Sequence, residues 1–303
     1  MGDTFELSLR QWDPSKVLRD RRCILIGKPA TGKSCASVDI MYHLRDMADG
    51  VVFSPTDKFT GQWESFVPPI SVYDGWDSKV VQQVFDRQYA LWKAKWKQLV
   101  EEARQNGTIA CKEDVKIEPV YIIADDCLAD SAFTKDPLLN QIFMNGRHLK
   151  IFFMATCQWL LSMKIQQRQL VDYLVVAAED SPPALIRLYD SFFSGYFPTY
   201  QAFVDVLQAV TQNYGMLVLD RTNRTSNKFE DHIFWWKPQL RKQHSFKIGS
   251  PEFWQYSMQQ YQEKLQLDTQ PIDPQVGMGL NPRQSKRPRI QVRQLDANGN
   301  PYQ

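Results

Sequence analysis

Residues 27–34 read GKPATGKS and fit the pattern GxxxxGK[ST], which constrains the fold of this chain more than any other segment. The apolar run Cys23-Ile24-Leu25-Ile26 comes just before it and predicts a buried strand, and a helix is expected from about Lys33 to Met47. At such a strand–loop–helix junction, backbone N–H groups turn inward and bind an anion. The pattern therefore predicts a phosphate-binding loop, and an ordinary glycine-rich turn is the weaker interpretation.

Each residue type in this loop has its own chemical use. Gly27 and Gly32 allow the backbone to turn its N–H groups toward the phosphates. Lys33 is placed to reach the β- and γ-phosphates, and Ser34 offers a hydroxyl group to Mg²⁺. We expect nine consecutive residues to bind the nucleotide: Gly27, Lys28, Pro29, Ala30, Thr31, Gly32, Lys33, Ser34 and Cys35.

Composition places the chain among globular proteins. Its 303 residues are 43% hydrophobic, which is enough for one large α/β domain with a substantial core. No run approaches the roughly 18 apolar residues of a membrane span, and the opening MGDTFE is unlike a signal peptide, so we expect a cytosolic or nuclear protein that is not secreted. The five cysteines are scattered without CxxC spacing, which indicates neither a disulfide framework nor a zinc site.

Apolar runs alternate with helical stretches along the chain. Beyond residues 23–27, strands are expected at 51–56, 120–124, 149–156, 174–178 and 215–220, with 234–237 as a last edge strand. Helices are expected at 78–105, as a long and largely exposed insertion, and at 138–145. This alternation predicts an α/β fold, a mostly parallel central sheet covered by helices on both faces.

Three regions follow from these patterns. Residues 1–21 are expected to form an N-terminal arm or edge strand, residues 22–264 the phosphate-loop domain, and residues 265–303 a disordered tail rich in Gln and Pro. The tail is basic, and it fits either a solvated tail or one that contacts nucleic acid or an import receptor. Its basic residues are Arg283, Lys286, Arg287, Arg289 and Arg293.

The acids Asp125 and Asp126 directly follow the apolar run 120–124. Hydrophobic residues followed by an acid are typical of the Mg²⁺-holding strand of phosphate-loop enzymes, and ligands gather at the carboxyl ends of parallel strands. We assign Asp125 to the water shell of Mg²⁺ and Asp126 to the general base that activates the hydrolytic water. Two acids in a solvated turn remain the simpler alternative.

Other polar residues are candidates for catalysis. Gln158 follows the strand 149–156, and its amide can contact both the γ-phosphate and the attacking water. Phosphoryl transfer commonly needs an arginine from a neighbouring subunit to neutralise charge in the transition state. Arg147, in the turn Asn145-Gly146-Arg147-His148, ranks first for that role, followed by Arg168 and then Arg187, and an ordinary surface arginine is the alternative for each.

Several functions are disfavoured. No Asn-Lys-x-Asp element for guanine recognition occurs at a suitable place, so ATP is expected rather than GTP. The four histidines are too widely separated to indicate a metal cluster. The net charge of +2 does not by itself indicate nucleic-acid binding, so any basic surface must be a local patch.

The order and spacing of these motifs resemble the poxvirus-type genome-packaging ATPases of large DNA viruses, which belong to the FtsK/HerA group. The resemblance covers about residues 22–237, and its most specific parts are the paired acids, the GRH turn, the strand that ends in Gln and the FWWKP segment. The segments that carry it are GKPATGKS, VVFSPT, VYIIADDC, NGRHLKIFFMATCQ, QQRQLVDYLVV, NYGMLVLDRT and DHIFWWKP.

The resemblance implies an additional-strand ATPase that assembles as a homo-oligomeric ring, hexamer or pentamer, and threads double-stranded DNA into a preformed capsid. It implies nucleotide-site roles for Lys33, Ser34, Asp125, Asp126 and Gln158, with Arg147 or Arg168 acting in trans. It further implies a capsid or portal-vertex partner and a location in the virion or the infected host cell. The helix 78–105 and the basic tail have no clear counterpart in the shared motifs.

Three other functions stay open on the sequence. A helicase or a DNA-transfer ATPase would share every nucleotide-site residue. A nucleotide kinase would need a basic lid, and no arginine-rich pattern of that kind follows residue 160. A non-hydrolysing capsid scaffold that binds ATP is disfavoured by the intact acids Asp125 and Asp126.

Overall fold

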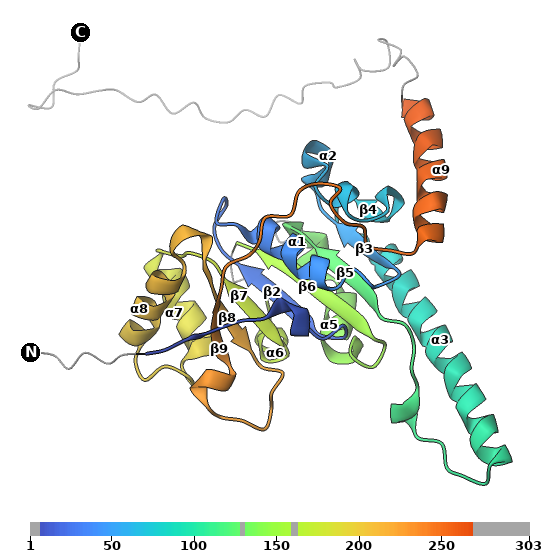
Figure 1. The fold of residues 1–303 in the computed structure, drawn as a ribbon, viewed down its shortest axis with the longest axis horizontal. Helices are drawn as coiled ribbons and strands as arrows, with labels where there is room; N and C mark the ends of the chain where they lie inside the picture. The colour runs from blue at the N-terminus through green and yellow to red at the C-terminus, as the bar shows by residue number, and fades with distance from the viewer. Residues whose placement is uncertain (1–6, 128–130, 159–162, 269–303) are drawn as a thin grey trace, which may run out of the picture. The chain divides into compact units, whose positions relative to one another are not determined.

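The protein is described by a computed structural model that covers residues 7–127, 131–158 and 163–268. Within these residues, nine strands form one sheet in the order β1-β9-β8-β7-β2-β6-β5-β3-β4 (Figure 1). Strand β8 runs antiparallel to both of its neighbours, and the other pairs are parallel. The strands are β1 (Arg10–Gln11), β2 (Arg22–Ile26), β3 (Gly50–Phe53), β4 (Val72–Tyr73), β5 (Val120–Ala124), β6 (Ile151–Cys157), β7 (Tyr173–Val176), β8 (Met216–Asp220) and β9 (Ile233–Trp236).

Helices cover both faces of this sheet. The described helices are α1 (Lys33–His43), α2 (Asp57–Thr60), α3 (Ser78–Gln105), α4 (Ser131–Lys135), α5 (Pro137–Asn145), α6 (Ile165–Gln169), α7 (Pro182–Leu188), α8 (Tyr200–Val210) and α9 (Pro251–Asp268). Successive side chains of a strand point to opposite faces, so Ile24 and Ile26 enter one apolar cluster while Cys23 and Leu25 enter the other. Helices α3, α5, α7 and α8 contribute to the first cluster, and α1 contributes to the second. The predicted mostly parallel α/β fold is confirmed.

The position of β6 is the feature that organises the site. It lies between β2 and β5 and is parallel to both, with Ala155 paired to Ile24 on one side and to Ala124 on the other. This is the extra strand that the additional-strand type requires between the phosphate loop and the acids. Because the three strands are parallel, the residues that follow them meet at one edge of the sheet.

Helix α3 spans the residues predicted for it. The side chain of Asp77 caps its first turn by accepting a hydrogen bond from the Lys79 N–H group. Its buried residues all lie in its first eleven positions, and they are Val81, Val84, Phe85 and Gln88. The rest of the helix is predominantly exposed, as expected from its many Lys, Gln and Glu residues.

Some predicted boundaries and one predicted edge are wrong. Helix α1 ends at His43 rather than Met47, and β3 ends at Phe53 rather than residue 56. Strand β9 is not the edge of the sheet, because the N-terminal arm adds β1 outside it, with Arg10 paired to Phe234. This pairing satisfies backbone groups that β9 would otherwise leave open.

The compact α/β unit extends to Gln262, and a second unit begins at Glu263. Helix α9 continues to Asp268, beyond the predicted start of the tail at residue 265. The basic residues of the predicted tail lie outside the described residues. No described helix has the length and apolar character needed to cross a membrane.

Candidate functional site: the phosphate loop and the paired acids

The loop between β2 and α1 has the backbone geometry of an anion cradle. Gly32 caps α1 with φ 91°, in the left-handed region, and as a glycine it offers no side-chain cap to the first turn. The first N–H groups of a helix have no acceptors within the helix, so those after Gly32 are available to a phosphate. Thr31 Oγ1 and Lys33 Nζ each donate to the Lys28 carbonyl oxygen, at 2.7 Å, and these two bonds hold the loop closed.

Gly27 allows the start of the loop to pack closely against the neighbouring strands of the sheet. Its N–H group donates to the Cys157 carbonyl oxygen of β6 at 3.1 Å. A Cβ atom at this position would lie 2.7 Å from Ala177 Cβ and 2.8 Å from Thr31 Oγ1. A larger residue would therefore push the loop off the sheet, away from the acids carried by the neighbouring strands.

The other predicted loop residues surround this cradle. Lys28 pairs with Asp180 and Glu179, which follow β7. Ala30 has φ 61°, which contributes to the tight turn, and the Cys35 thiol lies 3.6 Å from the Gln239 carbonyl oxygen. Pro29 is exposed beside Ala30.

The two acids are held by one threonine of β6. Thr156 Oγ1 donates to Asp125 Oδ1 at 2.7 Å and accepts from the Asp126 N–H group at 2.8 Å. Gln158 Nε2 donates to Asp126 Oδ1 at 3.2 Å. The Asp126 backbone has φ 54°, a strained value of the kind that clusters at functional sites. Asp125, Asp126 and Gln158 are thus brought together beside the loop.

Two residues that sequence reasoning missed, Trp63 and Thr156, donate hydrogen bonds to Asp125. Trp63 Nε1 donates to Asp125 Oδ2 at 2.8 Å, and the Trp63 N–H group donates to Oδ1 of the buried Asp57 at 2.8 Å. With Trp63 and Thr156 each donating to one oxygen, the Asp125 carboxylate is oriented from both sides. The buried tryptophan offers no sequence signal, whereas Thr156 is a polar residue within the apolar run of β6.

Burial sets the acid–base properties of the site. It lowers the pKa of Lys33 from its usual value, while the charges of Asp126 and Asp125 act in the opposite direction. Burial also raises the pKa of Asp125, and the hydrogen bonds from Trp63 and Thr156 partly offset that rise. A cation bound beside Asp125 would favour its ionised form, so the carboxylate is suited to a metal ion.

Two of the three arginines predicted to act in trans lie away from the phosphate loop of their own chain. Arg147 is exposed and precedes β6, and Arg168 lies in the last turn of α6, before β7. Both therefore sit near the amino ends of parallel strands, whereas the phosphate loop follows the carboxyl end of β2. The five residues of β2 span about 16 Å, so neither arginine is placed to reach the loop of its own chain. Arg187 is exposed on α7.

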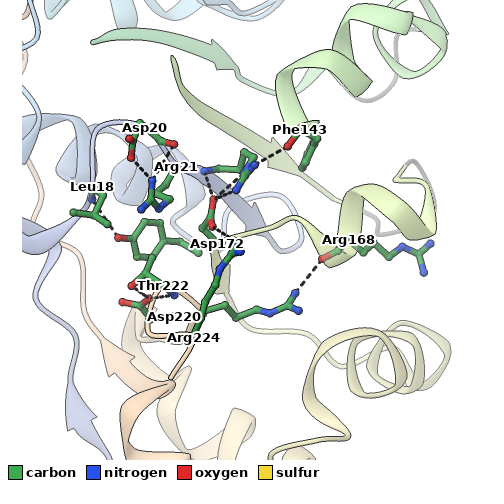
Figure 2. Close-up of polar contacts among 12 residues, drawn as sticks. Leu18, Asp20, Arg21, Phe143, Arg168, Asp172, Asp220, Thr222 and Arg224 are labelled. Atoms are coloured by element: carbon green, nitrogen blue, oxygen red, sulfur yellow. Dashed lines mark hydrogen bonds and ion pairs between the residues drawn. The ribbon is translucent and has the colours of Figure 1, made fainter. Parts of the chain in front are cut away.

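Arg168 also has partners at its own edge of the sheet. Its carbonyl oxygen accepts from Arg221 at 3.2 Å, and its guanidinium group donates to the Met163 carbonyl oxygen and to Ser191 Oγ. Figure 2 shows the side chain directed away from Asp172, which lies in the same region. A role for Arg168 in trans would require these contacts to rearrange.

Similar proteins occur in large DNA viruses. The chain is 29% identical to protein L437 of Acanthamoeba polyphaga mimivirus, over 82% of each chain. It is 23% identical to protein 075L of Invertebrate iridescent virus 6, over 87% of this chain and 98% of that one. No protein-family model matches the chain.

Among solved structures, the genome packaging NTPase B204 of Sulfolobus turreted icosahedral virus 2 in complex with AMPPCP is 14% identical, with a TM-score of 0.43. That match covers 75% of this chain and 100% of B204. The pCW3 conjugation coupling protein TcpA is 12% identical, with a TM-score of 0.44, over 75% of this chain and 62% of TcpA.

The relatives come from the group of viruses to which the motif resemblance points. Their similarity extends along most of the chain, and the strand order places an extra strand between the phosphate loop and the paired acids. The chain is therefore a phosphate-loop α/β protein of the additional-strand type, related to proteins of large DNA viruses.

Proposed function

We propose that this protein is an ATPase that drives double-stranded DNA into a viral capsid. The observation that carries the proposal is the meeting of Lys33, Asp125, Asp126 and Gln158 at one edge of the sheet, with Thr156 joining the two acids. A glycine-rich turn in a non-catalytic protein has no need for this arrangement. The viral relatives and the order of the motifs support the packaging role.

The residues fit ATP and Mg²⁺. Mg²⁺ prefers oxygen ligands and keeps several waters, so the Ser34 hydroxyl and a water held by Asp125 are a suitable set. When bound, the ion would neutralise negative charge that develops on the phosphates during transfer. The loop N–H groups and Lys33 bind and orient the phosphates, and burial of Asp125 strengthens its attraction for a cation.

Asp126 would act as the general base. It takes a proton from the attacking water, and Gln158, which donates to Oδ1 of Asp126, holds both the carboxylate and the water in line with the γ-phosphate. A ring of subunits, hexamer or pentamer, would supply a further positive charge at each site through an arginine from the neighbouring subunit. Arg147 is the first choice and Arg168 the second.

The motor would hold DNA by its backbone. Packaging must accept any sequence, so Lys and Arg contacts to phosphate are expected, with strong salt dependence and little base readout. Exposed basic residues of α3 between positions 87 and 104, or those of the segment 221–228, would supply these contacts. The ring would work at a capsid or portal vertex, in the virion or the infected cell.

ATP turnover measured with and without linear double-stranded DNA, over a range of protein concentrations, tests the proposal. We expect turnover to increase with DNA and to rise more steeply than linearly with protein, because each site is completed by a neighbouring subunit. Arg147→Ala should abolish the increase, and Lys16→Ala, at an exposed residue of the N-terminal arm, should not. Turnover that is linear in protein and indifferent to DNA would instead favour a kinase or a scaffold.

Trp63→Phe is expected to shift the pH dependence of Mg²⁺-dependent turnover. The indole N–H group lowers the pKa of Asp125, so its removal leaves burial less opposed and raises that pKa further. The cation needs an ionised carboxylate, so the acidic limb of the pH profile should move to higher pH. The same profile measured for Trp254→Phe, whose indole bonds only the Ile248 carbonyl oxygen, should remain that of the wild type. An unmoved limb in Trp63→Phe would contradict a cation-binding role for Asp125.

A further inference from the structure

The positions of the acids fix the direction in which a bound nucleotide must lie. Asp125 and Asp126 follow β5 and Gln158 follows β6, on one side of the phosphate loop. The terminal phosphate must point toward that side to meet them. The nucleoside must therefore leave the loop on the other side, where β7 and β8 adjoin β2.

An exposed aromatic residue occupies that other side. Strand β8 is antiparallel to β7, so its first residue, Met216, lies at the same edge of the sheet as the phosphate loop. Tyr214 comes two residues earlier and is 66% exposed. A Cβ atom on Gly32 would lie 3.5 Å from Tyr214 Cδ1 and 3.5 Å from Met216 Cε. The phenol ring thus stands directly against the loop glycine while most of its surface remains uncovered.

The backbone holds Tyr214 there under strain. Asn213 has φ 52° and Tyr214 has φ 65°, two successive residues in the left-handed region. Tyrosine has no local reason to adopt this conformation, which is disfavoured because it brings Cβ close to the following carbonyl oxygen. Gly215 closes the turn, since a Cβ atom there would overlap the Val210 carbonyl oxygen. The turn therefore keeps a large apolar ring in water beside the loop, a costly arrangement that burial of the ring by a ligand would offset.

We propose that Tyr214 stacks on the base of the bound nucleotide, with Met216 beneath it as an apolar floor. This inference rests on the proposed nucleotide-binding function and deepens it by assigning the nucleoside subsite. A flat ring stacks on any base and more strongly on a purine, so the subsite contributes affinity for adenine nucleotides without hydrogen-bond readout.

Binding of two ligands to the full-length protein tests this assignment. ATP carries a base, whereas inorganic tripolyphosphate presents only the phosphates, and both are titrated with Mg²⁺ by calorimetry. Tyr214→Ala is expected to weaken ATP binding by about tenfold or more and to leave tripolyphosphate binding unchanged. Tyr214→Phe keeps the ring and should retain wild-type affinity for both. Tyr256→Ala removes a comparably exposed tyrosine of α9 and serves as the matched control.

Two results would overturn the assignment while leaving the proposed function intact. One is unchanged ATP affinity in Tyr214→Ala, and the other is an equal loss for ATP and tripolyphosphate, which would mean that the residue only shapes the loop. A wild-type protein that binds neither ligand would instead refute nucleotide binding, and the subsite with it. Melting temperatures of the variants separate loss of binding from loss of the fold.

Discussion

The Asp126→Asn protein is expected to bind ATP normally and to lose about 10²–10⁴-fold of its turnover. An amide cannot accept the proton of the attacking water, so the chemical step loses its base. Asparagine tolerates the left-handed backbone found at this position and can still accept from Gln158, so the local structure should be preserved.

Single-turnover hydrolysis and equilibrium ATP binding, measured on the same preparation, check this prediction. Asp74→Asn makes the same chemical change at an exposed turn residue and should leave both quantities unchanged. A scaffold protein that uses ATP only to fix its assembly would show no effect of Asp126→Asn on its assembly or its nucleotide dependence. Near-wild-type turnover in the variant would remove Asp126 from the role of base.

Asp172→Ala is expected to lower the free energy of unfolding by about 3–5 kcal/mol. Asp172 and Arg22 are both buried, and Asp172 Oδ2 accepts from Arg22 Nε at 2.7 Å and from the Arg22 N–H group at 3.0 Å (Figure 2). The truncation leaves the buried guanidinium group without its counter-ion. Its remaining bond to the Phe143 carbonyl oxygen, at 2.6 Å, does not neutralise the charge.

Urea unfolding followed by circular dichroism gives this free energy. Asp46→Ala is the matched control, because it breaks the ion pair with Arg19 on an exposed surface, where such pairs contribute about 0–1 kcal/mol. Arg224, which pairs with the other oxygen of Asp172, is itself a cation and cannot neutralise Arg22. A loss of unfolding free energy below about 1 kcal/mol in Asp172→Ala would therefore contradict the prediction.

Local patterns predicted the elements that carry their own signals. The phosphate loop is a contiguous motif, β5 is a short apolar run that ends in two acids, and α3 is a long stretch without Pro or Gly, and each occurs where expected. The ends of the elements were less predictable. Helix α1 ends at His43, although the composition of the residues that follow is compatible with a longer helix. An arm or edge strand was expected at the N-terminus, but its pairing with β9 was not predicted, because a two-residue strand is too short to indicate its partner.

The sequence by itself determined the phosphate loop, the acid pair and the alternation that makes the sheet mostly parallel, because these depend on neighbours in the chain and on spacing. Only the tertiary structure decided which side chains complete the site. Trp63 and Thr156 reach Asp125 from positions 62 and 31 residues away, and Tyr214 reaches Gly32 from much later in the chain. The residue type determines which hydrogen bonds a side chain can form. Which partner it meets depends on the order of the strands in the sheet, and that order is established by long-range packing.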